Sequence, residues 1–369
     1  MASATIFGMY GPDSDWIFFL TDGNRFRARA DQLGFTLGND TIKGTFGFRN
    51  KGFGGQFGKM LNTTDGVNYN FNPTISMGLG YTSSLISVGV GYNATVGSHT
   101  QKYNGKLEPK TVNKSAHTPV LVLNAMDNAF RMAIPIQVYV DNDKFDGGGY
   151  DNKMAVSVDS QFRYYTGLDA LPQVRLYLRY GLYQNETKAT KDAEKVKTKY
   201  GESFGFDFRL YFGSMVEEVA LQPLVKLAYD GALGNYHANA RIQAVKAMNG
   251  DYATVNYGGG VWNLTLMTGL GLTANSDIIS LYLEPQLGLQ VTRKAPTTSP
   301  DAGGTGAPTP ASIASDSYGL AYNVYAEIYI TPLKNLEWYF EAQLGSDNDG
   351  AGGFGFNGTT GITWYLPAL

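Results

Sequence analysis

The sequence contains no cysteine and only 3 histidines in 369 residues. The absence of cysteine excludes a disulfide framework, a thiolate metal site and a cysteine nucleophile, and it fits any cellular compartment. The histidines, His99, His117 and His237, show none of the spacings that metal sites or catalytic triads require. We therefore expect no catalytic residues, no metal and no cofactor, and we predict that the protein is not an enzyme.

Charge and long apolar runs are also scarce. Charged residues make up 17% of the chain, against roughly 25% in an ordinary soluble domain, and the net charge is −3. Without a basic excess there is no field to hold nucleic acid, so we expect no nucleic-acid partner. The N-terminal apolar run Trp16–Leu20 is far shorter than the roughly 18 residues of a spanning helix. Residues 1–4 lack the basic and apolar parts of a secretory signal, and we expect a mature chain whose signal has been removed.

What the sequence has in abundance is strict alternation of residue types along many segments. From Tyr318 to Ile330 the even positions are apolar or aromatic, whereas the odd positions include Gly319, Asn323 and Glu327. A period of two over about ten residues predicts a β-strand with two chemically different faces, and helical spacing does not fit it. The same alternation recurs in residues 174–180, 204–212, 279–289 and 336–344.

The connections between these segments alternate between short and long. Short ones follow Leu37, Tyr81, Ala125, Ala274 and Pro332, and two slightly longer ones span residues 167–173 and 213–218. Long polar stretches lie between them, at residues 50–72, 94–116, 141–152, 184–198, 230–257 and 292–316. Tight turns at one end and long loops at the other are typical of outer-membrane barrels. We predict an all-β fold, a single antiparallel transmembrane β-barrel domain over residues 1–369 with short periplasmic turns and long extracellular loops.

The same alternation gives the number of strands. Fifteen candidates begin near residues 24, 41, 73, 85, 117, 129, 153, 173, 199, 218, 261, 278, 318, 335 and 354. Because the first of them runs into a short turn, it needs a preceding strand, for which Ala4–Tyr10 is the candidate, and the total is about 16. Within the N-terminal segment 1–23, residues 13–20 fit a short helix or a stub of strand. The phase shift between Ala30 and Leu33 predicts a bulge in the strand from Asn24.

A soluble sandwich or propeller is the competing fold, because both also contain many short alternating strands. Three tryptophans favour the membrane barrel. Trp262, Trp338 and Trp364 all fall on the apolar face near predicted strand ends, where membrane barrels place their aromatic girdles.

If the apolar face meets lipid, the other face lines the lumen, and many of its residues are small. These are Gly47, Gly78, Gly80, Gly89, Gly91, Gly205, Gly269, Gly271 and Gly361. A barrel of about 16 strands is wide enough for an aqueous channel, and small residues would leave it open. The alternative is that they relieve strain in a curved sheet, or make room for a folded-in loop or for the Trp16–Leu20 segment.

Charged residues on the predicted lumenal face are segregated by strand. We predict that the pore is lined by Arg131, Arg163, Arg175, Arg179 and Arg209 on four successive strands, and by Glu284, Glu327, Glu337 and Glu341 on three strands further round. Opposed basic and acidic walls would set a transverse field across a constriction and tune ion passage. The alternative is that each charge is paired locally, for instance through Asp159 or Asp207. Lumenal tyrosines such as Tyr177 and Tyr325 are expected to fill the wall and to bond to these charges, rather than to form a sugar track.

Several stretches resemble the variable surface proteins of intestinal spirochaetes. They are Phe7–Gly11, Asp15–Ile17, Phe19–Asn24, Phe26–Arg29 and Gln32–Phe35, followed by 117–121, 163–167, 208–212 and 272–277. The resemblance spans most of the chain outside the long loops. It implies an abundant, immunodominant outer-membrane protein. We expect this protein to form a homo-oligomer, for which a trimer is one candidate. The resemblance supplies no catalytic or binding residues to carry over.

Together these features predict a surface protein of the bacterial outer membrane that acts as a porin-like passive diffusion channel for small hydrophilic solutes or ions and as an exposed antigen. Its expected partners are outer-membrane lipid, these solutes, and a host surface or antibodies. The alternative is a non-conducting structural surface antigen or adhesin whose long loops contact the host.

Overall fold

The computed structural model describes residue 10 and residues 15–29, 32–50, 73–97, 102–103, 106–107, 112–144, 147–216, 219–234, 239–244, 247, 260–294, 315–345 and 355–367. One short 3-10 helix and nineteen strands are assigned in these ranges. They are η1 (Asp15–Phe18), β1 (Arg25–Arg29), β2 (Gln32–Gly38), β3 (Ile42–Asn50), β4 (Pro73–Tyr81), β5 (Ile86–Gly97), β6 (Lys102–Tyr103), β7 (Lys106–Leu107), β8 (Val112–Ala125), β9 (Phe130–Lys144), β10 (Tyr150–Leu168), β11 (Leu171–Lys188), β12 (Val196–Tyr211), β13 (Ser214–Val216), β14 (Val219–Ala232), β15 (Trp262–Asn275), β16 (Ile279–Lys294), β17 (Ser315–Leu333), β18 (Leu336–Gly345) and β19 (Gly355–Tyr365).

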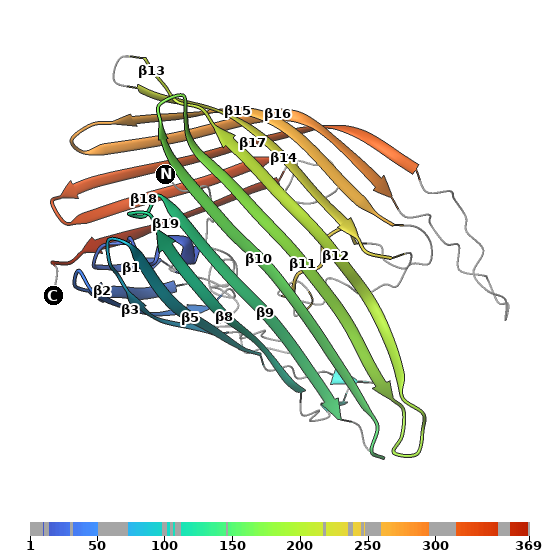
Figure 1. Cartoon of the computed structure of the whole chain (residues 1–369). Coiled ribbons are helices and arrows are strands. Elements are labelled where there is room, and N and C mark those ends of the chain that lie inside the picture. The colour runs from blue at the N-terminus through green and yellow to red at the C-terminus, as the bar shows by residue number, and fades with distance from the viewer. Residues whose placement is uncertain are drawn as a thin grey trace.

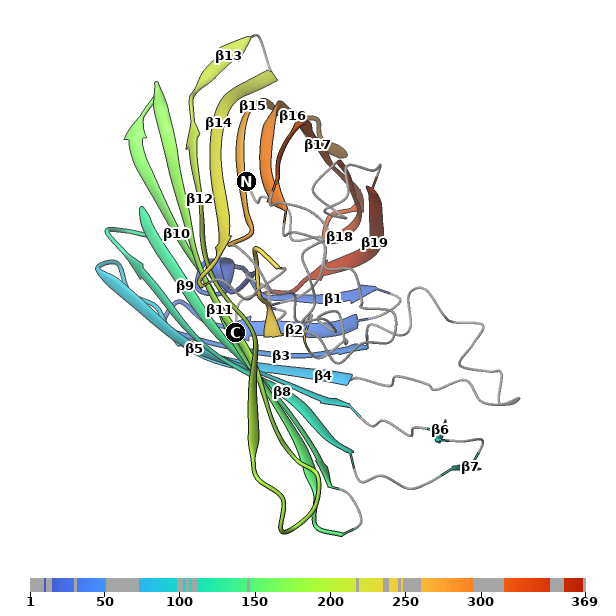
Figure 2. The same cartoon turned by 90° about the vertical axis from the view of Figure 1, so that its right-hand side faces the viewer.

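The strands close into a barrel of sixteen positions. Seventeen strands belong to one sheet, while β6 and β7 form a separate pair. β12 and β13 both pair with β14 and share one position, which leaves sixteen. Each strand is antiparallel to its neighbours in the chain, and β1 closes the sheet by pairing with β19 as well as with β2. Figures 1 and 2 show the resulting curved wall, in which β9–β12 reach far beyond the short strands β1–β3.

The exposed and buried faces of the strands are those that the alternation predicts. The outward Leu320, Trp338 and Leu289 are 62%, 46% and 66% exposed, whereas the inward Arg175 and Glu284 are each 2% exposed. This is the reverse of a soluble protein, in which exposed strand faces carry the polar residues. Such an exterior suits hydrocarbon, and a closed barrel leaves no strand edge unpaired within it.

The short turns lie at one end of the barrel and are built by polar side chains. In the turn between β2 and β3, Asn39 Oδ1 accepts bonds from the backbone N–H groups of Thr41 and Ile42, each at 2.9 Å. In the turn between β15 and β16, Ser276 Oγ accepts a bond from Ile279 N at 3.0 Å. These local bonds satisfy backbone donors where the ladder stops, which is why Asn and Ser mark the strand ends in the sequence.

The total of about sixteen strands was correct, but its composition at the N-terminus was wrong. The segment from Asn24 is not one bulged strand, because β1 and β2 form a hairpin in which Ala28 faces Leu33 and Phe26 faces Phe35. A two-residue connection and a bulge shift the apolar phase in the same way, so the sequence pattern did not separate them. Since β1 closes the barrel against β19, no earlier strand stands between them; residues 4–9 of the expected first strand lie outside the described residues.

Two of the expected long loops are largely strand. The ladder between β9 and β10 continues to the Lys144–Tyr150 pair, and the ladder between β11 and β12 continues to Thr187 and Val196. The polar composition of residues 141–152 and 184–198 therefore reflects a sheet that extends past the apolar band into water, where alternation of hydrophobicity is no longer needed. Within the described residues, no helix has the length and hydrophobicity to cross a membrane.

Candidate functional site: the charged inner wall

Five basic residues form one continuous row across the inner face of the barrel. Arg163 on β10 faces Arg131 on β9 and Arg175 on β11. Arg175 in turn faces Arg209 on β12, and Arg209 faces Lys226 on β14. We call these five residues the basic row. Like charges directly opposite each other in a sheet are destabilising, so the row must be compensated by other contacts.

Aromatic rings supply part of that compensation. The guanidinium groups of Arg131, Arg175 and Arg209 lie over the rings of Tyr165, Tyr211 and Tyr177, at 4.8, 4.3 and 5.0 Å from the ring centroids. A cation over an aromatic face is attracted by the ring quadrupole, more strongly when both are withdrawn from water. These lumenal tyrosines therefore separate and stabilise neighbouring arginines.

Aspartates neutralise one end of the row. Arg209 makes a two-pronged contact to Asp207, with Nε–Oδ1 at 2.8 Å and Nη2–Oδ2 at 2.7 Å. On β11, Arg179 lies two residues beyond Tyr177, which faces Asp207. Its guanidinium lies 3.1 Å from Asp230, 3.6 Å from Asp159 and 3.7 Å from Asp207. We call Arg179, Arg209 and these three carboxylates the aspartate network. The local pairing that the sequence left as an alternative is thus realised for these two arginines.

A glycine makes the network possible. Gly205 stands between Arg179 and Asp230 in the register of β11, β12 and β14. A Cβ at Gly205 would overlap the Asp230 carboxylate. The missing side chain lets the two charged groups meet across β12, so Gly205 does not mark open space.

Arg163 is the most enclosed member of the basic row. It is 1% exposed, and its guanidinium lies 4.5 Å from the ring centroid of Phe18, the last residue of η1. Its Nε and Nη1 have no hydrogen-bond partner among the described residues. A buried guanidinium with free donors is costly unless water or an anion reaches it, so this point of the wall offers donors to water or to an anion.

The glutamates occupy a separate sector on β16–β18. Glu327 faces Glu341 across β17 and β18. Tyr325 donates a hydrogen bond to Glu327, and Glu284 accepts bonds from Tyr282 and, at 2.6 Å, from Gln286 Nε2. Glu337 lies near the turns, where it accepts a bond from Tyr365 at 2.9 Å. Only β15 separates β14 from β16. The basic and acidic sectors therefore approach each other at β14 and β16. At their other ends, β9 with Arg131 lies halfway around the sixteen-position barrel from β18 with Glu337 and Glu341, so the two opposed walls remain a prediction.

The N-terminal segment folds into the barrel and packs on the inner wall. Trp16 and Phe19 are fully buried, and their rings meet edge to face at 5.4 Å. Figure 2 shows η1 inside the curve of the sheet beside β9, and it packs on β8 and β9. Arg131 Nη1 donates to Thr21 Oγ1 at 3.2 Å, which ties this segment to the basic row. Residues 15–18 of this region form a short 3-10 helix, as one of the two expectations had it, while residues 13 and 14 lie outside the described residues.

Glycines form the seat of this segment. Gly78 faces Gly91 and Gly80 faces Gly89 across β4 and β5. A Cβ at Gly78 would come within 2.6 Å of the Trp16 ring, and one at Gly80 within 2.6 Å of Leu20. We call these four residues the glycine seat. The inward glycines of β4 and β5 accommodate the Trp16–Leu20 segment, so their reading as open lumen is wrong for this part of the wall.

A second segment between β14 and β15, described at residues 239–244 and at Ala247, also docks inside. The backbone N–H groups of Ile242 and Ala244 donate to Ser203 Oγ at 2.8 Å and Ser157 Oγ at 2.9 Å. Arg241 Nη2 lies 2.6 Å from Asp159 Oδ2, so the segment joins the aspartate network. Ile242 and Ala244 are buried with Tyr139 and Tyr183 of the wall. The sequence placed residues 230–257 in an exterior loop, and nothing in their composition indicated docking.

The nine residues expected to line the pore all belong to strands of the barrel, but they differ in access to solvent. Arg163, Arg175, Glu284 and Glu327 are buried, whereas Arg131, Arg179, Arg209, Glu337 and Glu341 are half-buried. Two further cations of the inner wall were not predicted. Lys226 lies between Val225 and Leu227 in an alternating strand, which is a signal that could have revealed it, whereas Arg241 lies outside any such strand. Among the described residues no cluster of His, Asp and Glu is arranged to hold a metal ion.

A closed antiparallel barrel with an apolar exterior and a charged interior defines the class of outer-membrane β-barrel proteins. Within that class, the chain belongs to the Serpulina hyodysenteriae variable surface protein family, which it matches over residues 1–365. Fold and family together indicate the outer membrane as its location.

Solved structures give distant likenesses. The open form of the ferric-catecholate import receptor Fiu from E. coli K12 is 10% identical, with a TM-score of 0.45 over 82% of this chain and 56% of the receptor. The chain therefore spans little more than half of that receptor's length. A loop L8 deletion mutant of OmpT from Vibrio cholerae is also 10% identical, with a TM-score of 0.34 over 93% of this chain and 97% of that one. No curated protein matches the chain.

Proposed function

We propose that the protein is a porin-like passive diffusion channel for small hydrophilic solutes or ions, and that its loops form an exposed surface antigen. The observation that supports this most is the basic row on the inner face of a sixteen-position barrel. Three of its members, Arg131, Arg209 and Lys226, are half-buried and so remain within reach of water. A wall of partly hydrated charge is what a water-filled passage needs and a packed core does not.

In this proposal the docked segments set the width of the passage. The N-terminal segment covers Arg163, and Ile242, Ala244 and Ala247 cover the wall at Tyr183, so solutes pass through the space that these two segments leave. Charges beside a narrow, partly dehydrated passage act on ions with little screening. The aspartate network cancels Arg179 and Arg209, and its Asp207 also lies 3.9 Å from Lys226. Selectivity therefore falls to Arg131, Arg163 and Arg175 in one sector and to the four glutamates in the other.

The first experiment is the conductance of the purified full chain in planar bilayers, compared with Trp16→Ala. Loss of this ring from the glycine seat is expected to loosen the N-terminal segment and to raise or destabilise the single-channel current. Trp364→Ala is the matched control, because Trp364 is 51% exposed on the outer face and should leave the current unchanged. Absence of current from both the parent and Trp16→Ala, with the barrel folded, would contradict the channel.

Ion selectivity gives the second experiment. Replacing Arg131, Arg163 and Arg175 by Gln should move the reversal potential toward cation preference, and replacing Glu284, Glu327, Glu337 and Glu341 by Gln should move it toward anions. The difference should shrink near 1 M salt, where the Debye length is roughly 3 Å. An unchanged reversal potential in both variants would assign these charges a structural role only.

The second candidate is a non-conducting surface antigen or adhesin. It is favoured by the enclosure of Arg163, Arg175, Glu284 and Glu327, each 2% exposed or less, beneath docked segments and neighbouring side chains. In that case host contact depends on the exterior loops, and deletion of residues 296–314 between β16 and β17 should abolish binding to host glycans or matrix. Conductance would then be absent while antibody recognition and the homo-oligomer, such as a trimer, persist.

A further inference from the structure

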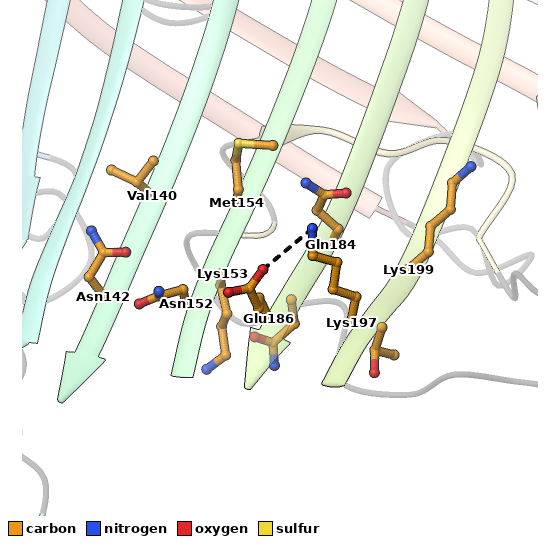
Figure 3. A pocket seen from close by; sticks show the side chains of 11 residues that line it. Val140, Asn142, Asn152, Lys153, Met154, Gln184, Glu186, Lys197 and Lys199 are labelled. Atoms are coloured by element: carbon orange, nitrogen blue, oxygen red, sulfur yellow. Dashed lines mark ion pairs between the residues drawn. The ribbon is translucent and has the colours of Figure 1, made fainter. Parts of the chain in front are cut away.

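A groove lies on the outer face of the wall, at the loop end of β9–β12. It has a volume of about 370 Å³ and is lined by Val140, Asn142, Asn152, Lys153, Met154, Gln184, Asn185, Glu186, Lys197, Thr198 and Lys199. The strand register orders most of these side chains into two levels. Val140, Met154, Gln184 and Lys199 form one level, and Asn142, Asn152, Glu186 and Lys197 form the next one outward along the strands. Figure 3 shows these side chains projecting from four neighbouring strands.

The groove faces away from the lumen. On β9, β10 and β11 the lumenal positions are those of Tyr139, Ala155 and Tyr183, which pack on the docked residues Ile242 and Ala244. The groove residues Val140, Met154 and Gln184 are their immediate neighbours in sequence and therefore point to the opposite side. The next level toward the turns on this outer side consists of Val138, Val156 and Leu182, so the groove continues the apolar exterior.

The groove lies at the height along the wall where lipid meets water. A tilted strand crosses the apolar band in roughly 9–11 residues. Counted along β10 from the outward-facing Tyr164, which is 39% exposed near the short turn, that length ends at about Met154. The apolar floor of the groove thus lies at the edge of the band, and its amides and lysines lie at the level of lipid headgroups.

Donor groups exceed acceptors in the groove. Two lysines, Lys197 and Lys199, and three amide side chains, those of Asn142, Asn152 and Gln184, lie on the outer side of the groove, against one carboxylate, Glu186. That carboxylate is already engaged by Tyr150 Oη at 2.6 Å and by Lys195 and Lys197 at 3.4 and 3.5 Å. The hydrogen bond from Tyr150, together with Lys195, lowers the pKa of Glu186 below its ordinary value. Lys197 and Lys199 keep 79% and 48% of their side chains exposed. Lys199 also pairs with Glu202, but an ammonium group has three donors, so both lysines retain donors for a ligand.

We propose that this groove is a binding site for the anionic headgroup of an outer-leaflet lipid. The acyl chains lie along Val138, Val156 and Leu182, the headgroup phosphate or carboxylate is held by Lys197 and Lys199, and hydroxyl groups bond to the amides of Asn142, Asn152 and Gln184. Juxtamembrane lysine clusters attract anionic lipid, and an apolar floor beside them distinguishes a lipid from a free anion. The proposal concerns the exterior of the barrel and does not depend on channel activity.

The test uses the full chain in nanodiscs of zwitterionic lipid that contain phosphatidylglycerol as the anionic probe, with retained lipid counted by native mass spectrometry. The double variant Lys197→Gln, Lys199→Gln should retain about tenfold less of the anionic lipid. The double variant Lys188→Gln, Lys191→Gln removes the same charge from the same hairpin without touching the groove, and it should retain as much as the parent. Circular dichroism checks that both variants keep their strands.

Three outcomes would overturn the site. One is a parent that retains no more anionic than zwitterionic lipid. Another is an equal loss in both double variants, which would indicate general charge attraction. The third is displacement of the retained lipid by an equal concentration of soluble glycerol 3-phosphate, which would mean that the groove binds a free anion rather than a lipid.

Discussion

The two parts of the inner wall on which segments dock are built in opposite ways. On β4 and β5 the wall presents the glycine seat, and the docked side is the aromatic cluster of Trp16 and Phe19. On β9–β14 the wall presents the basic row and the aspartate network, and the docked segment brings Arg241 and backbone N–H groups. One contact is made by shape and exclusion of water, and the other by charge and hydrogen bonds. The same alternation of strand residues therefore supports two kinds of lumenal packing.

The largest expected effect on stability comes from a substitution in the aspartate network. Asp207 is 1% exposed and contacts Arg209, Arg179 and, at 3.9 Å, Lys226. Asp207→Asn leaves buried cations without their shared counter-charge, so the free energy of unfolding should fall by about 3–5 kcal/mol. Urea unfolding of the refolded barrel, followed by circular dichroism, measures it.

Asp230→Asn is the control for that variant. Asp230 is 19% exposed and contacts Arg179, which keeps its other carboxylate partners. The free energy of unfolding of Asp230→Asn should therefore fall by only about 1 kcal/mol. If the two variants were equally destabilised, the aspartate network would not be centred on Asp207, and the contrast with the glycine seat would weaken.

A smaller loss of stability is expected from a substitution in the glycine seat. A side chain at Gly91 overlaps the Trp16 ring, so Gly91→Leu should expel the N-terminal segment and destabilise the protein by about 1–3 kcal/mol. Limited proteolysis should then cleave residues 10–24 faster than in the parent. Gly44→Ala on the neighbouring β3 meets no atom closer than 3.9 Å and should leave the cleavage rate unchanged. Equal cleavage in Gly91→Leu and the parent would show that the seat does not hold the segment.

The smallest effect is expected where docking depends on one partly exposed ion pair. Arg241 and Asp159 keep 32% and 23% of their side chains exposed. Arg241→Gln should therefore cost about 0.2–1 kcal/mol and should be weaker still in high salt. Urea unfolding at low and high salt measures both. A loss as large as that of Asp207→Asn would mean that Arg241, and not the two serine contacts, holds residues 239–244 in place.

Predictions from the sequence were confirmed for properties that depend on a single strand. Alternation separates the two faces of a strand without knowledge of its neighbours, so Trp338 and Leu320 were placed outward and Arg175 and Glu284 inward correctly. The prediction failed at β1 and β2, because a hairpin turn and a bulge leave the same phase shift. It also failed for residues 184–188, where polar composition was taken for a loop although the ladder continues.

The sequence by itself determined that the chain is a barrel with lipid outside and charge inside, because a period of two is a property of each strand alone. Only the tertiary structure decided which charges meet. The height of a residue along the barrel axis depends on the register between neighbouring strands. This register places Arg131, Arg163, Arg175 and Arg209 in one row. It also places Gly205 between Arg179 and Asp230. Docking of Trp16 on Gly78 and Gly91 likewise joins residues that are more than sixty positions apart, and the packing of rings on a bare backbone has no sequence period that would reveal it.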